Sequence, residues 1–325
     1  MLNEIKKKIK KGDLEKMFED RKKLVNQKQS LRIIEKFSEI YKSQYINDSE
    51  YVDQLKKENG YLALLVFVKS YAYERQGRAR AYPKIAFECI SKYYNNGDSW
   101  DIPTEKDAKE IWKEYKNLAK EKYNLVEKDE HNQLRIKVNE DRNPLNDDKG
   151  IIKIIAQNKI KNIALFVLEK FKENKTKIVY NFFVNKVRGI GFKISSFYLR
   201  DIADKGLEKK LLSNENEITD LYLLQPIDTW VDQVTEIIFG EVIKDRVVKQ
   251  RKIVALCQSA GVSSINFNQG AWILGNQLAG DFGSLKKILK DKNGLLDIIK
   301  KKVEKLNDYS RILNDIMKEI QFEHA

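Results

Sequence analysis

Apolar residues recur at helical spacing along most of the chain. In residues 33–41, 151–171 and 295–306 they stand three or four positions apart, which is the period of an amphipathic helix. Clean alternation of apolar and polar residues is rare, and the best candidate strand is 134–138, Leu-Arg-Ile-Lys-Val. Only 4 prolines and 15 glycines interrupt the pattern. The sequence therefore predicts an all-α protein.

Polar stretches divide this helical pattern into segments. They fall at 95–98, 139–150 and 213–219, where clusters of Asn, Asp, Ser and Gly favour turns. The stretch 139–150 is the best candidate linker between subdomains. We expect a charged helical N-terminal extension, two helical subdomains and a set of C-terminal helices, over residues 1–60, 61–150, 151–245 and 246–325.

The charge of the chain points to a polyanionic partner. Its 325 residues include 61 Lys and Arg against 48 Asp and Glu, a net charge of +13. Such a surplus favours nucleic acid first and an anionic membrane second, although a lysine-rich surface can also remain without a ligand. No window approaches 18 uncharged apolar residues, and no apolar stretch follows the first lysines. We therefore expect a cytoplasmic protein with neither a membrane span nor a secretory signal.

The chain has few of the side chains that bind metals through sulfur or imidazole. It contains two cysteines, Cys89 and Cys257, and two histidines, His131 and His324. Four cysteines for an iron–sulfur cluster are absent, and a zinc site would need nearly all of these scattered residues. We expect no metal and no cofactor.

Two amphipathic stretches flank residues 187–192, Val-Arg-Gly-Ile-Gly-Phe, and this arrangement predicts a tight helical hairpin. Gly189 and Gly191 can end one helix and begin the next, because glycine adopts conformations that other residues avoid. Ile190 between them is the apolar residue that would hold the turn against its own helices. An ordinary turn between two helices is the alternative interpretation.

The N-terminus of the second helix is a candidate phosphate site. Backbone N–H groups in the first turn of a helix lack intrahelical partners, and glycine leaves them accessible to an anion. Arg188 and Lys186 add positive charge beside them. A hairpin of this kind would bind one DNA strand by its backbone without reading bases.

Two further residues suggest chemistry at this hairpin. Lys193 lies in the first turn of the second helix, where the helix dipole disfavours a cation. Partial burial would act in the same direction, and a neutral lysine amine is a nucleophile; a solvated surface lysine is the alternative. Asp228, after Pro226, precedes an amphipathic stretch and is expected to cap a helix. The same carboxylate would face a pocket near Lys193, whereas Asp232 has the position of a solvated residue.

At these residues the sequence resembles the helix-hairpin-helix DNA glycosylases, and particularly their 8-oxoguanine glycosylase branches. The similarity lies in Gly189–Arg200, Gly-Ile-Gly-Phe-Lys-Ile-Ser-Ser-Phe-Tyr-Leu-Arg, and in Pro226–Val231, Pro-Ile-Asp-Thr-Trp-Val. It implies an all-α glycosylase fold whose active site lies in the cleft between two helical subdomains. Residues 61–150 would border the lesion pocket, 151–245 would form the catalytic subdomain, and the C-terminal helices would pack back on the pocket.

The resemblance implies a bifunctional DNA glycosylase and lyase in base excision repair. Lys193 would attack the sugar of a flipped nucleotide and form a Schiff base, Asp228 would stabilise the cationic sugar, and β-elimination would cut the strand. The residues expected to bind the DNA backbone are Lys186, Arg188, Gly189, Ile190 and Gly191. The candidates for the base pocket are Tyr73, Gln76, Phe192, Trp230 and Trp272; for each aromatic, core packing is the alternative.

The expected partner is double-stranded DNA that contains a damaged base, bound by a monomer. Lys193 and Asp228 are 35 residues apart, so the insert at about 205–221 must loop out if their side chains are to meet. Two alternatives remain. The excised base could be another damaged or phage-modified base, or the chain could be a non-enzymatic helix-hairpin-helix module, which needs neither Lys193 nor Asp228.

Overall fold

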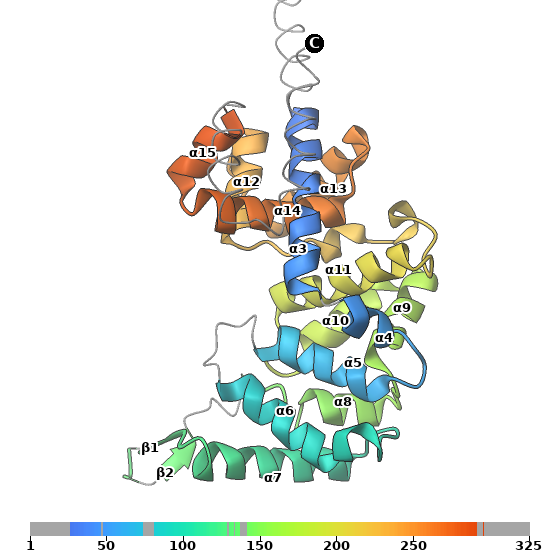
Figure 1. Cartoon of the computed structure of the whole chain (residues 1–325), viewed down its shortest axis with the longest axis vertical. Coiled ribbons are helices and arrows are strands. Elements are labelled where there is room, and N and C mark those ends of the chain that lie inside the picture. The colour runs from blue at the N-terminus through green and yellow to red at the C-terminus, as the bar shows by residue number, and fades with distance from the viewer. Residues whose placement is uncertain are drawn as a thin grey trace, which may run out of the picture. The chain divides into compact units, whose positions relative to one another are not determined.

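The fold is helical, as the sequence predicts. The computed structural model describes residues 27–46, 48–73, 81–128, 130–132, 134–136, 142–290 and 295. Helices, with their turns and loops, account for these residues apart from one two-stranded sheet (Figure 1). In that sheet β1, Val126–Lys128, pairs antiparallel with β2, Leu134–Ile136. The predicted strand is thus confirmed at 134–136, and residues 137 and 138 lie outside the described part.

The chain forms two compact units. Unit 1 comprises the described residues up to Tyr45 and those from Ile227 onward, and unit 2 comprises the described residues between Ile46 and Pro226. Residues 142–150, the described part of the stretch 139–150 that the sequence suggests as a linker, form a loop inside unit 2, where Asn143 and Leu145 are buried. The division into four segments at 60, 150 and 245 stays a prediction.

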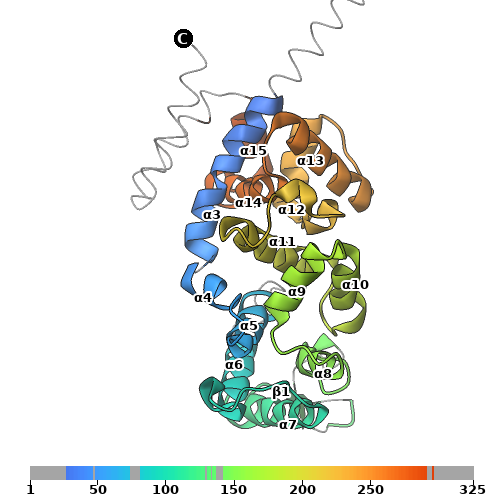
Figure 2. The same cartoon turned by 90° about the vertical axis from the view of Figure 1, so that its right-hand side faces the viewer.

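Unit 2 contains the hairpin. Its elements before the loop 142–150 are α4 (Asp48–Asp53), α5 (Gly60–Phe67), the π-helix η1 (Val68–Tyr73), α6 (Ala81–Tyr93), η3 (Asn95–Gly97), α7 (Glu105–Glu121) and the sheet. Those after it are α8 (Ile151–Gln157), α9 (Ile163–Lys172), α10 (Thr176–Lys186), α11 (Phe192–Glu208), η5 (Glu215–Glu217) and η6 (Leu221–Leu224). Helices α6 and α7 lie side by side in both views (Figure 2).

Helix α11 is central to the packing of unit 2. It contacts α4, α9, α10, η1 and η6. Its Tyr198 ring meets the rings of Phe67, Tyr71 and Phe183 edge-on, with centroids 4.9 to 5.3 Å apart. Such edge-to-face pairs stabilise a core beyond the burial of their area. The middle of the helix that begins at the hairpin is therefore packed into the core of unit 2.

Unit 1 combines the start and the end of the described chain. Its elements are the helical residues 27–36, α3 (Ser38–Tyr45), α12 (Thr229–Phe239), α13 (Arg246–Ala260), α14 (Ser264–Ile273), the π-helix η7 (Leu274–Ala279) and α15 (Phe282–Lys290). Helix α14 packs closely on the N-terminal helix, because a Cβ atom on Gly270 would lie 1.8 Å from the carbonyl oxygen of Ile34. Glycine at this position permits the close approach.

Local signals fix the ends of several helices. Thr104 and Asp107 form a capping box at the start of α7, in which each side chain accepts the other residue's backbone N–H. Helices α12 and α13 end at Gly240 and Gly261, whose φ angles of 70° and 67° are left-handed. These caps satisfy backbone groups that a helix end leaves without partners.

Candidate nucleic-acid interface

The predicted helical hairpin is present in unit 2. Helix α10 ends at Lys186 and α11 begins at Phe192. Gly189 has a φ of +76°, a left-handed conformation that favours glycine. Ile190 is 3% exposed, and its backbone amide donates to the carbonyl of Val187 at 3.3 Å. The turn is therefore tight and is held by a buried apolar side chain, as the sequence predicts.

The loop 142–150 packs against the hairpin at Arg188 and Gly189. A Cβ atom on Gly189 would lie 2.2 Å from the carbonyl oxygen of Arg142. The backbone amide of Arg188 donates to the carbonyl of Lys149 at 2.8 Å, and its guanidinium forms a 2.8 Å ion pair with Asp148. Arg188 thus joins the hairpin to this loop, and its predicted contact with DNA phosphate stays a prediction.

At Gly191 the hairpin has no packing neighbour among the described residues where a side chain would be. Gly191 is the N-cap of α11 with φ −96° and ψ −178°, and a Cβ atom there would meet no other atom within 4 Å. Extended backbone of this kind is available to any residue, so neither strain nor crowding requires glycine at 191. Glycine thus places no side chain over the start of α11, where backbone amides that lack intrahelical partners can bind an anion. Lys186 is exposed at the end of α10.

Lys193 lies in the first turn of α11, as predicted, but its side chain is exposed. The expected partial burial is therefore not seen, and the exposure is that of the alternative, a solvated surface lysine; the next residues of the same turn, Ile194 and Ser195, are buried. Its Nζ lies 5.8 Å from the centroid of the Phe197 ring. The guanidinium carbon of Arg200 lies 5.0 Å from the same centroid. The ring of Phe197, one turn after Lys193, thus lies close to both cations.

A buried polar network supports α11 further along. Arg200 and Asp201 are both fully buried, and the guanidinium contacts the carboxylate at 2.6 Å. The other oxygen of Asp201 accepts a 2.8 Å hydrogen bond from the hydroxyl of Tyr71 in η1, which also lies 2.8 Å from the hydroxyl of Tyr51. Burial raises the pKa of the neighbouring Tyr198 hydroxyl well above its usual value. The sequence pattern does not indicate this network, because its members lie on three separate elements.

Asp228 caps α12, as predicted. Its carboxylate accepts a 2.8 Å hydrogen bond from the backbone amide of Val231, and the residue is 8% exposed. Asp232 lies one turn later, and its half-exposed side chain forms an ion pair with Lys249. Asp228 belongs to unit 1, whereas the hairpin and Lys193 belong to unit 2. The meeting of the Asp228 and Lys193 side chains stays a prediction.

A hydrogen bond within unit 2 joins the start of α11 to η6, the element that precedes Asp228 in the chain. The hydroxyl of Ser196, three residues after Lys193, donates to the carbonyl of Leu223 at 2.6 Å. Leu223 belongs to η6 and precedes Asp228 by five residues. The chain between them first continues as α11 to Glu208, and residues 209–222 then return to the start of that helix. The insert expected at about 205–221 thus begins in the last turn of α11, and whether it lets the two side chains meet stays a prediction. Ser196 was not singled out from the sequence, because serine within a helix has no distinctive signal.

Two of the base-pocket candidates that the structure describes lie in unit 2. Tyr73 is fully buried and donates a hydrogen bond to Asn143, which is a core role. Phe192 is 49% exposed at the start of α11, so among the described candidates its ring is the most accessible. Gln76 lies outside the described residues.

The two tryptophan candidates take part in packing within unit 1. Trp272 meets the rings of Tyr41 and Tyr45 edge-on, with centroids 6.0 and 5.0 Å apart. Trp230 lies so close to Gly275 that a Cβ atom there would stand 2.6 Å from its ring. Both side chains remain partly exposed, and their contact with a base stays a prediction.

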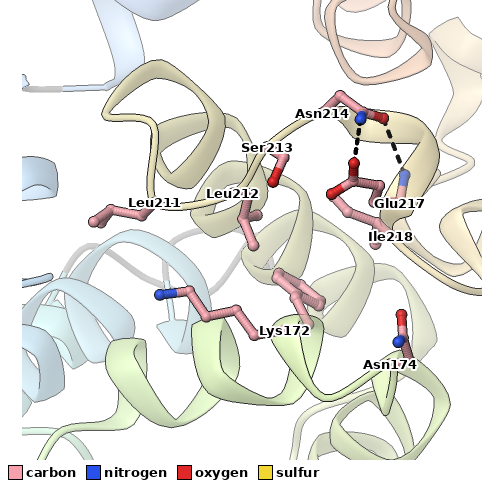
Figure 3. A pocket seen from close by; sticks show the side chains of 9 residues that line it. Lys172, Asn174, Leu211, Leu212, Ser213, Asn214, Glu217 and Ile218 are labelled. Atoms are coloured by element: carbon pink, nitrogen blue, oxygen red, sulfur yellow. Dashed lines mark hydrogen bonds between the residues drawn. The ribbon is translucent and has the colours of Figure 1, made fainter.

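A pocket of about 430 Å³ lies beyond the other end of α11 (Figure 3). The end of α9 and the insert after α11 form it, through Phe171, Lys172, Asn174, Leu211, Leu212, Ser213, Asn214, Glu217 and Ile218. Asn214 accepts a hydrogen bond from the Glu217 amide at 3.2 Å and donates to its carboxylate at 2.6 Å. Because none of the predicted site residues lines it, this pocket does not belong to the hairpin site.

Comparison with known proteins gives no match: no family model, no curated protein and no solved structure is significantly similar to this chain. The function must therefore be argued from the residues themselves. In the part of the chain that the structure describes, no helix has the length and apolar character needed to cross a membrane.

Proposed function

We propose that this chain is a bifunctional DNA glycosylase and lyase of the helix-hairpin-helix type. The observation that carries the proposal is the exposed side chain of Lys193 in the first turn of α11, directly after an open glycine hairpin. A primary amine and the backbone amides of a helix start, which lack intrahelical partners, stand within a few residues of each other. An amine that attacks a nucleotide needs a neighbouring group that holds the phosphate backbone.

The hairpin holds the DNA strand through its backbone. Amides at the start of α11 donate to a phosphate next to the lesion, and Lys186 adds non-specific attraction. These contacts carry no sequence information, which suits an enzyme that must act wherever damage occurs. The net charge of +13 supports the same partner, double-stranded DNA.

The reaction takes place on a nucleotide flipped out of the duplex, because its sugar cannot be reached inside the stack. The amine of Lys193 forms a bond to C1′ as the N-glycosidic bond breaks, and the base leaves with the bonding electrons and takes up a proton. The sugar ring opens and leaves an imine between Lys193 and C1′. Loss of a proton from C2′ then expels the 3′ phosphate and cuts the strand.

Asp228 supplies the negative charge for this reaction. Its carboxylate stabilises the sugar as positive charge develops at C1′, and it transfers protons between the amine, the base and C2′. The same carboxylate caps α12 through the backbone amide of Val231. The resemblance of the sequence to 8-oxoguanine glycosylases suggests an oxidised purine as the excised base.

Borohydride trapping tests the proposal. The protein is incubated with one duplex that contains 8-oxoguanine and with another that contains an abasic site, and sodium borohydride then reduces any imine to a stable adduct. We expect an adduct with both duplexes, its loss in Lys193→Gln, and its retention in the control Lys177→Gln, which removes the charge of an exposed lysine at the other end of α10.

The outcomes separate the alternatives. An adduct with the abasic duplex but not with the 8-oxoguanine duplex would support the lyase activity and indicate that the enzyme excises a different damaged base. DNA binding without any adduct would identify a non-enzymatic hairpin module. Adduct formation by Lys193→Gln at the wild-type rate would refute the assignment of the nucleophile.

A further inference from the structure

The loop 142–150, which packs against the hairpin, is itself held in place by a buried asparagine. Asn143 is fully buried, and its Oδ1 accepts hydrogen bonds from the hydroxyl of Tyr73 and from the backbone amide of Leu145, the latter at 2.9 Å. The second bond closes a turn in which an asparagine side chain fixes the backbone two residues later. Both bonds satisfy a group that would be costly to bury without partners.

The position of the Tyr73 hydroxyl is set by stacked rings. Tyr73 is the last residue of η1, and its ring stacks on Tyr115 of α7 with centroids 6.2 Å apart. Tyr115 in turn stacks on Trp112 at 5.4 Å. The hydroxyl therefore reaches Asn143 from a ring that can move little within its packed surroundings.

Asn143 lies directly beside the surface on which the hairpin rests. The carbonyl of Arg142, the preceding residue, is the group against which Gly189 packs. The far end of the same loop accepts the amide of Arg188 through Lys149. A shift of the backbone at 142–143 would thus displace Gly189, and with it the amides that follow.

We propose that Tyr73 and Asn143 form a buried latch that positions the hairpin for the DNA backbone, with Asn143 as the positioning residue. This inference rests on the proposed function, because it assumes that the hairpin binds DNA. In this proposal Tyr73 supports the hairpin through the loop 142–150 and does not contact the excised base.

The test compares two tyrosines of the same π-helix. Tyr73→Phe removes the hydroxyl that bonds Asn143 and keeps the stacked ring. The matched control is Tyr71→Phe, which removes an equally buried hydroxyl that bonds Tyr51 and Asp201 instead. The probe is a duplex with a tetrahydrofuran abasic-site analogue, which cannot form an imine, and its Kd is measured over a range of salt concentrations well below the melting temperature of each variant.

We expect Tyr73→Phe to raise the Kd about five- to tenfold and to leave the slope of log K against log salt unchanged, because the contact that is lost is made by neutral backbone amides and not by a cation. Tyr71→Phe should lower stability at least as much, because its hydroxyl bonds a buried carboxylate, and should leave both quantities at their wild-type values. Equal effects of the two substitutions on the Kd would overturn the latch and leave the proposed function standing.

A second variant keeps the test decisive if Tyr73→Phe folds poorly. Asn143→Ala removes the acceptor and should weaken binding as Tyr73→Phe does, and the double variant should bind no more weakly than Asn143→Ala alone. Additive losses would overturn the latch. If the wild-type protein binds neither the analogue duplex nor undamaged DNA, the proposed function and the latch both fail.

Discussion

Gly189 of the hairpin packs directly on the carbonyl oxygen of Arg142, with room for no side chain between them. A Cβ atom on residue 189 would lie 2.2 Å from that oxygen. Gly191, two residues later, has open space where its Cβ would be. The two glycines of one short turn therefore have different roles: the first permits packing and the second leaves the surface accessible.

Gly189→Ala should destabilise unit 2. The φ of +76° is unfavourable for alanine, and the new Cβ would collide with backbone, which cannot move aside as a flexible side chain can. The left-handed conformation alone costs about 1 kcal/mol, so the total loss should exceed that figure. Denaturant unfolding measures it, and a variant with wild-type stability would contradict the close packing.

Gly191→Ser should separate stability from binding. Serine is at least as good an N-cap as glycine, and the site has room for its side chain, so the free energy of unfolding should change by less than about 1 kcal/mol. The hydroxyl would bond the first amides of α11 and compete with phosphate. We expect weaker binding of duplex DNA in a fluorescence titration at unchanged stability; unaltered affinity would place the phosphate elsewhere.

Substitution of Asp228 should distinguish capping from catalysis. Asn caps a helix about as well as Asp, whereas Ala loses about 1 kcal/mol. Asp228→Asn should therefore unfold like the wild type but release the damaged base at least tenfold more slowly, a loss of about 1.4 kcal/mol in transition-state stabilisation. Single-turnover assays give the rate, and an unchanged rate in Asp228→Asn would reduce Asp228 to a helix cap.

Ser196→Ala should cost more stability than Ser195→Ala. The hydroxyl of Ser196 bonds the carbonyl of Leu223 on another element, whereas that of Ser195 bonds Gly191 of its own helix, whose carbonyl already accepts the backbone amide of Ser195. Loss of the partner of a buried carbonyl costs about 1–3 kcal/mol. Thermal unfolding of the two variants side by side measures the difference, and equal stabilities would show that the Leu223 contact contributes little.

Several parts of the candidate site could be predicted because they depend on neighbours along the chain. The hairpin follows from glycines between two amphipathic stretches, and the cap at Asp228 follows from a short acidic side chain before such a stretch. The buried Ile190 follows from an apolar residue placed between turn glycines. In each case the physical cause acts within a few residues.

Other features depended on residues far apart in the sequence. The exposure of Lys193 is set by which helices cover α11, and the ion pair of Arg188 is set by a loop forty residues earlier. The role of Tyr73 could not be read from its own segment, because its partner Asn143 lies seventy residues later.

The sequence by itself determined the helical class, the glycine hairpin, the cap of α12 and the basic charge, because local periodicity, backbone freedom and composition need no knowledge of distant residues. Only the tertiary structure decided which hairpin glycine packs and which stays open, what holds the loop beneath them, and how Ser196 joins α11 to η6. Those features arise from burial and from hydrogen bonds between separate elements, which exist only once the chain has folded.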